Sequence, residues 1–328
     1  MRIFSGIQPT GRKHLGNYIG AITQYVAGQD RGEAIYCIVD LHAITVEFDP
    51  ADLRERTYDT MAILLAAGLD PTRCILFRQS DVVEHTELTW LLSAVTAYGD
   101  LGRMTQFKEK APKQRELVSA GLFLYPMLQA ADVLAYRPDE VPVGDDQRQH
   151  LELTRDIAIR FNRTFGEVFV VPEHRIPTVG ARIMDLQDPT SKMSTTAASE
   201  DGTVYVLDEP ERIERKIGRA VTDSGEGIRR DPVKPGISNL IDVLAAVRGV
   251  GPTEIEREFA DARYGEFKSA VAAAVVEYLT PTRERYARLR GDVPALEATL
   301  ADGAERARAI ASATLADVRR VMGVGPPR

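Results

Sequence analysis

The first half of the chain alternates short apolar runs with longer amphipathic segments, and this alternation constrains the fold more than any other feature. Apolar runs of strand length cover residues 2–7, 34–40 and 73–78. Helical patterns follow them at 16–31, 51–67 and 84–98. Because strands that alternate with helices form parallel sheets, the sequence predicts an α/β fold with a Rossmann-like, doubly wound parallel sheet. Ligands of such sheets bind at the carboxyl ends of the strands, where the strand order reverses.

The rest of the chain is predominantly helical. Short strands are expected at 140–143 and 168–171, and a loop-rich connection over 172–203. Helices are expected at 103–136 with a break near Pro112, and at 146–162, 209–220, 237–247, 253–262, 267–279, 283–289 and 295–322. We therefore expect a catalytic body over 1–186 with an inserted helical segment at about 104–140. A linker over 187–208 and an all-helical domain over 209–328 follow, and the last helix is expected to pack back on the body.

Composition narrows the class of protein. The 328 residues carry a formal net charge of −7, from 41 Lys and Arg against 48 Asp and Glu, unlike proteins that coat nucleic acid. Cys37 and Cys74 lie in apolar runs and indicate reduced core thiols rather than a disulfide scaffold. No apolar run reaches the ~20 residues of a membrane span, and the first residues lack the apolar core of a secretory signal. We expect a cytoplasmic protein without membrane contact.

Several common catalytic motifs are absent from the sequence. It contains no Gly-Lys pair, hence no Walker A loop, and neither His-Glu-x-x-His nor Gly-x-Ser-x-Gly. Gly11, Gly16 and Gly20 follow the first strand without the Gly-x-Gly-x-x-Gly spacing of a dinucleotide site. The histidines and cysteines lack zinc-site spacing, so no metal ligands are expected. The sequence thus argues against hydride transfer, serine hydrolysis and metallohydrolysis.

Two other segments suit phosphate binding. Residues 8–17 (QPTGRKHLGN) lead from the first strand into a helix, whose free N–H groups and positive dipole end attract phosphates. Residues 189–196 (PTSKMSTT) place a Lys before hydroxyls in a loop, which suits a polyphosphate whose charge must be neutralised. Taken alone, the first segment is as typical of an ordinary surface turn as of a phosphate site. The second segment alone is as typical of a solvated loop. Their co-occurrence favours a nucleotide site.

At these residues the chain resembles the class I aminoacyl-tRNA synthetases, and in detail the bacterial tryptophanyl-tRNA synthetase family. Residues 14–17 (HLGN) are similar to the HIGH motif, and 192–196 (KMSTT) to the KMSKS motif. Further similar blocks are FSGIQP at 4–9, CIVDLHAIT at 37–45, RMTQFKEK at 103–110, PVGDDQRQHLEL at 142–153, AVTDS at 220–224 and KPGISNL at 234–240. The resemblance covers nearly the whole chain.

The resemblance implies a tryptophan–tRNA ligase. The carboxylate of L-tryptophan attacks the α-phosphate of ATP, and the tryptophanyl group of the resulting adenylate passes to tRNA(Trp). It implies ATP as cosubstrate, with Mg²⁺ carried by the ATP phosphates. No side-chain nucleophile is needed, so catalysis is positioning and charge stabilisation. The resemblance also implies a homodimer that meets at the insertion, and anticodon binding by 209–328.

The resemblance further assigns site residues. The implied catalytic residues are Lys192, Lys110, Gln8 and Asn17. The implied ATP-binding residues are Gln8, Pro9, Thr10, His14, Gly16, Asn17, Gly144, Asp145, Asp146, Ile183 (through its backbone), Lys192, Met193, Ser194, Thr195 and Thr196. The implied tryptophan-binding residues are Phe4, Gly6, His42, Gln129, Asp132, Val143 and Gln147. Asp132 lies in an apolar run, where a lone carboxylate is costly to bury. It is either the acceptor of the indole N–H or an acid paired with a nearby Lys or Arg.

Departures from the family pattern leave alternatives. Thr195 and Thr196 replace the second Lys and the final Ser of KMSKS, and a lost phosphate cation can cost about 10²- to 10³-fold in rate. Either Arg182, Lys110 or loop flexibility compensates, or turnover is slow. Gln129 and Asp145 stand where many members have Met and Glu. The alternatives are therefore a duplicated, inhibitor-tolerant isozyme or a synthetase-like binding or regulatory protein with weakened activity. A tyrosyl enzyme on the same fold is opposed by the FSGIQP and CIVDLHAIT blocks.

Positive charge is concentrated in two short stretches. The first contains Arg103, Lys108, Lys110, Lys113 and Arg115, and the second contains Arg283, Arg285, Arg288 and Arg290. Patches of this size can steer phosphates while the rest of the surface stays acidic. The second is equally typical of a solvated helix face.

Overall fold

Five parallel strands form one sheet in the order β3-β2-β1-β4-β5. The strands are β1 (Arg2–Ile7), β2 (Glu33–Ile38), β3 (Cys74–Arg78), β4 (Glu140–Pro142) and β5 (Glu173–Arg175). The sheet belongs to a computed structural model that describes residues 1–104, 119–144, 147–175, 183–194, 199–223, 225 and 227–326. The strand order reverses between β1 and β4. The prediction of a Rossmann-like, doubly wound parallel sheet is therefore confirmed, and this reversal is where ligands are expected.

The central strands are buried on both faces. β1 pairs along its whole length with β2, from Arg2 beside Glu33 to Ile7 beside Ile38. All residues of β2 after Glu33 are buried, so β2 is a continuous apolar run rather than an alternating one. β4 is shorter and pairs with β1 at Ile3, which leaves the carboxyl ends of β1 and β4 open toward one cleft.

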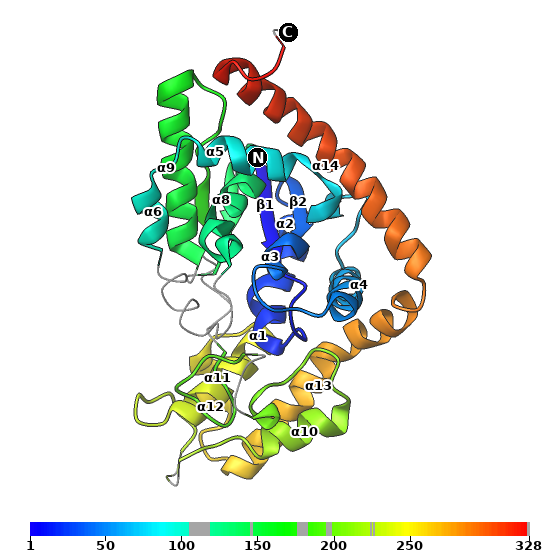
Figure 1. Cartoon of the computed structure of the whole chain (residues 1–328). Coiled ribbons are helices and arrows are strands. Elements are labelled where there is room, and N and C mark those ends of the chain that lie inside the picture. Colours follow the sequence, from blue (N-terminus) through cyan, green and yellow to red (C-terminus); the bar gives the residue numbers. More distant parts are fainter. Residues whose placement is uncertain are drawn as a thin grey trace.

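Helices cover both faces of the sheet (Figure 1). The helices of the sheet-bearing part are α1 (Leu15–Asn17), α2 (Thr23–Gly28), α3 (Asp40–Ala43), α4 (Pro50–Ala67), α5 (Glu84–Ser93), α6 (Tyr98–Gly102), α8 (Ala120–Leu134) and α9 (Arg148–Phe165), with a π-helical turn at Tyr18–Ile22 and 3-10 turns at Gln79–Asp81 and Glu200–Gly202. The helix expected over 84–98 is divided between α5 and α6, and the one expected over 16–31 is divided at the π-helical turn. In the part of the chain that the structure describes, no helix is long and apolar enough to cross a membrane.

The last strand lies later than the sequence predicts. We expected it at 168–171, but β5 begins at Glu173. The side chain of Asn162 accepts the N–H groups of Val168 and Phe169 at 3.1 and 3.0 Å, and its amide donates to the Phe169 carbonyl at 2.7 Å. Because these bonds occupy the backbone groups that a sheet would need, residues 168–171 form a loop at the end of α9.

The carboxyl-terminal part is all helical. It contains α10 (Pro210–Gly218), α11 (Pro235–Arg248), α12 (Pro252–Glu258), α13 (Tyr264–Leu289) and α14 (Val293–Met322). The expected break between 279 and 283 is wrong, because α13 continues through Pro281. Thr282 is buried and its hydroxyl bonds the Tyr18 hydroxyl at 2.6 Å, so packing against the sheet-bearing part supports the helix next to the missing N–H of Pro281.

The final helix runs back along the sheet-bearing part, from the helical end toward the opposite end of the molecule (Figure 1). Gly303 of α14 faces the backbone of β3, where a Cβ atom at this position would lie 1.9 Å from the Leu76 carbonyl oxygen. Further along, Arg319 forms an ion pair with Glu87 of α5. The close approach at Gly303 lets the helix cover the edge of the sheet.

Candidate active site

A cleft of about 750 Å³ opens where the strand order reverses, at the carboxyl ends of β1 and β4. Besides these strands, its walls come from the loop after β1, from α3 and α8, and from the segment around 192. The predicted site residues that line it are Phe4, Gly6, Gln8, Thr10, His14, Asn17, His42, Gln129, Asp132, Val143, Gly144, Gln147, Lys192, Met193 and Ser194. The fold thus collects residues from five separate stretches of the sequence into one space.

The other predicted site residues either do not line the cleft or lie outside the described part of the chain. Pro9, Gly16 and Ile183 do not line the cleft. Gly16 lies directly behind it, where a Cβ atom would meet the His14 ring at 3.1 Å and the Ile183 side chain at 3.6 Å. Lys110, Asp145, Asp146, Arg182, Thr195 and Thr196 lie outside the described residues.

His14 opens helix α1 at one end of the cleft. Its Nδ1 accepts the N–H of Asn17 at 3.3 Å, while Asn17 Oδ1 accepts the N–H of His14 at 3.2 Å, which makes a capping box. Burial and, to a smaller extent, the charges of Lys192 and Lys13 together lower the pKa of His14 to about 4. At neutral pH the ring is therefore uncharged, with its proton on Nε2 because Nδ1 is an acceptor.

Lys13 is a lining residue that the sequence analysis missed. Its Nζ donates to the Gln8 carbonyl at 2.7 Å and to the Thr10 carbonyl at 3.4 Å, so it holds the loop after β1 in a closed turn. Burial lowers the pKa of Lys13 to about 8, and the charge of Arg56 acts in the same direction. A lysine in a polar loop is usually solvated, so the sequence indicated a role for Lys13 in the site only through its position next to His14.

Backbone pairing holds the Lys192 segment beside the cleft. Lys192 and Met184 form an isolated antiparallel bridge, and the N–H of Met193 donates to the Ile183 carbonyl at 3.0 Å. The Met193 side chain is buried. Asn239 of α11 bonds both the N–H and the carbonyl of Met184, at 2.8 and 3.0 Å, so the helical part anchors this segment.

Asp132 lies on α8 at the other end of the cleft and is 2% exposed. Its Oδ1 accepts hydrogen bonds from Gln79 Nε2 at 2.7 Å and from His85 Nδ1 at 2.5 Å. Its Oδ2 is bonded to His42 Nε2 at 2.7 Å. Among the residues that the structure describes, the partners of this carboxylate are two histidines and an amide, and none of them is the Lys or Arg of the alternative interpretation.

These contacts keep Asp132 ionised. Burial raises its pKa, but the charge of His42 and the hydrogen bonds from His42 and His85 outweigh burial and hold the pKa well below its usual range. A carboxylate oxygen accepts about two hydrogen bonds, and Oδ2 accepts one from the described residues. Oδ2 can therefore accept one further donor from the cleft.

Sequence reasoning missed Gln79 and His85. Gln79 follows the last residue of β3, and polar residues at the carboxyl end of a parallel strand are candidate site residues. His85 stands at the start of α5 and links Asp132 to the Tyr136 hydroxyl, which its Nε2 meets at 2.6 Å. Nothing in the sequence around His85 distinguishes it from an ordinary core histidine.

The second predicted basic stretch lies at an internal contact. Arg283 donates to the Asp208 carbonyl at 3.1 Å, Arg285 to the Ala66 carbonyl at 2.5 Å, and Arg290 to Asp59 at 2.7 Å. Three of its four arginines therefore donate to residues outside α13, namely Ala66, Asp59 and Asp208, and are held at contacts between elements. Of the first stretch, Lys108, Lys110, Lys113 and Arg115 lie outside the described residues.

Comparison with known proteins settles the family. Residues 1–280 match the sequence model of the tRNA synthetases class I (W and Y). The chain belongs to this family. This synthetase is 50% identical over 330 residues to the tryptophan–tRNA ligase 2 of Streptomyces avermitilis, a match that covers 100% of the chain and 98% of the relative. It is 51% identical over 334 residues to the tryptophan–tRNA ligase of Mycobacterium leprae, covering 100% and 97%.

Solved structures agree with this assignment. The tryptophanyl-tRNA synthetase from Mycoplasma pneumoniae matches with a TM-score of 0.90 and 35% identity, over 99% of this chain and 98% of that one. The tryptophanyl-tRNA synthetase from Campylobacter jejuni, complexed with ADP and tryptophan, matches with a TM-score of 0.84 and 33% identity, over 99% and 100%. The synthetase therefore shares its whole architecture with these enzymes.

Proposed function

We propose that this synthetase is a tryptophan–tRNA ligase that activates L-tryptophan with ATP and transfers it to tRNA(Trp). The observation that carries the proposal is the composition of the cleft. A buried, ionised carboxylate, Asp132, stands at one end, and the phosphate-type residues His14, Asn17 and Lys192 stand at the other. Full-length relatives of about 50% identity carry the name tryptophan–tRNA ligase, which supports tryptophan rather than tyrosine as the amino acid.

The reaction needs two substitutions and no covalent bond to the protein. In the first, a carboxylate oxygen of tryptophan attacks the α-phosphorus of ATP, and the bond to the bridging oxygen breaks to release pyrophosphate. In the second, a hydroxyl of the terminal tRNA ribose attacks the carbonyl carbon of the adenylate and releases AMP. The residues of the cleft therefore act by holding the reactants in line and by stabilising charge.

We propose that ATP binds between two segments: the loop after β1 with the start of α1, and the segment that carries Lys192. The neutral His14 ring can donate through Nε2 to a phosphate oxygen, and the Asn17 side chain and the amino end of α1 lie beside it. Lys192 would approach the phosphates from the opposite wall. The resemblance assigns adenine to the Ile183 backbone, which adjoins Gly16 behind the lining of the cleft. Lys110 is expected to add a second cation. These donors suit phosphate oxygens rather than a metal ion, so we propose that Mg²⁺ enters on the ATP phosphates and offsets their charge.

We assign the Asp132 end to the tryptophan side chain. The indole N–H would donate to Asp132 Oδ2, and Phe4, His42 and Val143 would enclose the ring. Gln129 donates to Gln147 at 3.3 Å, so the wall that these amides form is polar. A site built to bond a substrate N–H rejects an analogue that lacks it by about 10⁴-fold, which would exclude phenylalanine.

ATP–pyrophosphate exchange tests the function. We expect exchange that depends on tryptophan and is far slower with tyrosine at equal concentration. Exchange with neither amino acid would contradict the enzymatic proposal, and faster exchange with tyrosine would contradict the specificity. A Thr195→Lys variant should exchange faster if the missing KMSKS cation limits the rate.

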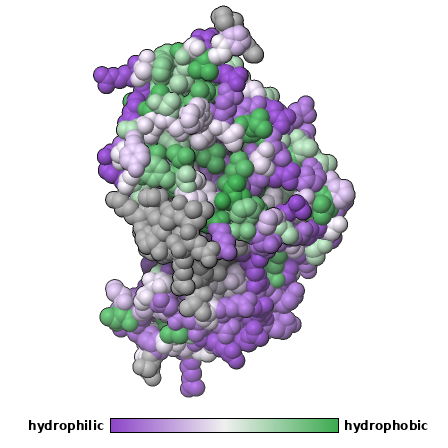
Figure 2. Space-filling view, viewed as in Figure 1, coloured by the Kyte–Doolittle hydropathy of each residue, from purple (hydrophilic) through white to green (hydrophobic). Residues whose placement is uncertain are grey.

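The proposed assembly is a cytoplasmic homodimer. Large apolar side chains are exposed to solvent on one group of helices, α5, α6, α8 and α9. They are Val83, directly before α5, and Trp90, Tyr98, Leu124 and Ile159. Figure 2 shows hydrophobic side chains on the part of the molecule that carries these helices. A second copy would cover this surface, with the insertion at about 104–140 at the contact.

We propose that 1–186 is the catalytic domain, 187–208 the KMSKS-type loop and linker, and 209–328 the part that binds the anticodon.

A further inference from the structure

Residues 203–208 connect the two segments that face the ATP end of the cleft, and we call them the bridge segment. On one side, its Val204 carbonyl accepts the N–H of Leu15 at 2.8 Å, and its Val206 N–H donates to the Lys13 carbonyl at 2.9 Å. On the other side, the Thr203 hydroxyl donates to the Ser194 carbonyl at 2.9 Å. The bridge segment therefore touches both the His14 loop and the segment that carries Lys192.

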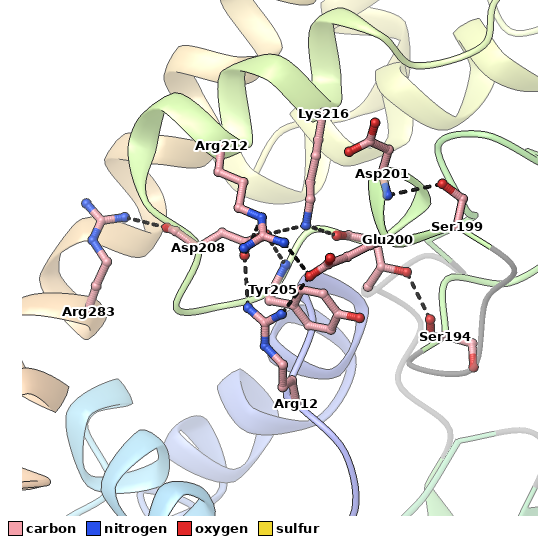
Figure 3. A network of polar contacts seen from close by, with 11 residues as sticks. Arg12, Ser194, Ser199, Glu200, Asp201, Tyr205, Asp208, Arg212, Lys216 and Arg283 are labelled. Carbon is pink, nitrogen blue, oxygen red and sulfur yellow. Dashed lines mark hydrogen bonds and ion pairs between the residues drawn. The ribbon is translucent and has the colours of Figure 1, made fainter.

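One buried lysine of the helical part holds both ends of the bridge segment. Nζ of Lys216, on α10, donates to the Thr203 carbonyl and to Asp208 Oδ2, each at 2.6 Å. The Lys216 and Asp208 side chains are both fully buried. Figure 3 shows Lys216 reaching from α10 into this network. A lysine has three donors, and two of them bond the first and last residues of the bridge segment.

Asp208 also receives the loop that follows β1. Arg12, two residues before His14, donates to Asp208 Oδ1 at 3.0 Å, and its guanidinium lies 3.8 Å from the centre of the Tyr205 ring. The Tyr205 N–H donates to Asp208 Oδ2 at 3.0 Å (Figure 3). The loop and the helical part thus meet at one carboxylate within the bridge segment.

We propose that Lys216 is a positioning residue for ATP, because it fixes the bridge segment and thereby the separation between His14 and Lys192. The proposal deepens the proposed function and rests on it. A buried ion pair is a poor source of stability, since well-packed apolar side chains can replace it at little cost. The Lys216 contacts instead fix the Thr203 carbonyl, next to the hydroxyl that bonds Ser194 of the cleft wall, and the Asp208 carboxylate, which also holds Arg12 of the loop before His14. Lys216 acts at a distance from the phosphates and is not itself a catalytic residue.

The test compares two lysine variants of the full-length protein. Lys216→Met removes the contact, and Lys268→Met is the matched control. Lys268 also belongs to the helical part and donates to backbone carbonyls, at Ala220 (2.8 Å) and Gly218 (3.4 Å). The readouts are the dissociation constants of Mg-ATP and of tryptophan by calorimetry, the KM for ATP in exchange, and the melting temperature.

We expect Lys216→Met to raise the dissociation constant and KM for ATP about 10-fold to 100-fold, the size that misplaced catalytic groups produce. Tryptophan affinity should stay within about twofold, because Asp132 lies at the other end of the cleft. Lys268→Met should lower the melting temperature and leave ATP binding unchanged. Unchanged ATP affinity in Lys216→Met, or an equal loss in both variants, would overturn the inference.

A double variant separates positioning from stability. Lys216→Met with Asp208→Asn removes both charges of the buried pair, while the asparagine oxygen can still accept from Arg12, which keeps its ion pair with Glu200. We expect it to melt closer to the wild type than Lys216→Met does while it keeps the weakened ATP binding. If the double variant regained both the melting temperature and the ATP affinity of the wild type, the role of Lys216 would be purely structural. Wild-type protein without tryptophan-dependent exchange would refute the proposed function alone, since the ATP calorimetry still decides the role of Lys216.

Discussion

Asp132 carries a charge in a place where burial acts to neutralise it. Its Oδ1 is committed to Gln79 and His85, which fix the orientation of the carboxylate, and His42 holds Oδ2. Because the orientation is fixed before any ligand arrives, the remaining acceptor position on Oδ2 can select a donor by geometry as well as by charge.

Substitution of this carboxylate tests its role. Asp132→Asn keeps the shape but removes the charge, and a hydrogen bond to a charged group is worth about 1.5 to 3 kcal/mol. We therefore expect kcat/KM for tryptophan to fall by about 10-fold to 100-fold in exchange assays. The KM for ATP should change little. Wild type should discriminate against an analogue with sulfur in place of the indole nitrogen, and the variant should discriminate much less. Equal discrimination by both proteins would show that Asp132 does not bind the N–H.

The His14 ring gives the stability a specific pH dependence. Its pKa is about 4 in the folded protein and about 6.5 when the chain is unfolded, so the unfolded chain binds the proton first. The stability that a neutral His14 contributes is complete above about pH 6.5 and is lost as the pH falls toward 4.

The variant His14→Asn isolates this effect, because asparagine still caps the helix. Between pH 7 and pH 5, the wild type should lose about 2 kcal/mol more unfolding free energy than the variant. Urea unfolding at the two pH values measures the difference. Identical pH dependence in both proteins would mean that the folded state binds the His14 proton at the same pH as the unfolded chain.

Part of the site could be predicted at the residue scale because motifs are local. His14 and Asn17 stand beside a strand end and a helix start, and Lys192 stands in a motif of its own. Gln79 and His85 could not be found in the same way. They act through Asp132, which is far from them in sequence. The packing of α5 and of the turn after β3 against α8 brings the three together.

At the scale of elements, apolar patterning predicted the central strands and failed where tertiary contacts decide. β1 was expected over 2–7 and occupies Arg2–Ile7. The last strand was misplaced because the Asn162 side chain bonds the backbone of 168–169. The break expected near Pro281 did not occur because α13 packs along its length on other elements. A sequence pattern indicates whether a segment favours a helix or a strand. It does not show which distant residues will bond or pack against that segment.

The docking of α14 on β3 depends on one glycine. A Cβ atom at Gly303 would lie 1.9 Å from the Leu76 carbonyl oxygen, so Gly303→Ala must push the helix from the sheet. We expect a loss of about 1 to 3 kcal/mol of unfolding free energy, as for other overpacked sites. Gly265→Ala is the control, because its Cβ would meet nothing within 4 Å. It should leave stability unchanged or raise it slightly. Equal stability of the two variants in urea unfolding would contradict this account of the docking.

At the scale of the whole molecule, the helical part and the sheet share one core. A single cluster of buried side chains contains Tyr36 of β2, Met61 of α4, Leu244 of α11 and Phe267 of α13. The arginines Arg283, Arg285 and Arg290 add polar contacts around it. Motion of the helical part should therefore be transmitted to the sheet-bearing part through packed side chains rather than through a free linker.

The sole tryptophan reports on assembly. Trp90 is 75% exposed on α5 within one chain, in the apolar surface assigned to the dimer. Sedimentation should give twice the mass of one chain for the wild type and a lower mass for Trp90→Lys. Val233→Lys is the control, because Val233 is 78% exposed on the helical part, and it should stay dimeric. A monomeric wild type, or a dimeric Trp90→Lys, would contradict the proposed interface.

We propose that one cleft holds tryptophan at Asp132 and ATP between His14 and Lys192. A crystal structure with a non-hydrolysable analogue of tryptophanyl-adenylate tests it most directly. We predict the indole nitrogen within about 3.2 Å of Asp132 Oδ2, a hydrogen-bond distance. The phosphate mimic should lie beside His14 and Asn17, and the adenine against the Ile183 backbone. An analogue bound elsewhere, or with its indole directed away from Asp132, would contradict the account.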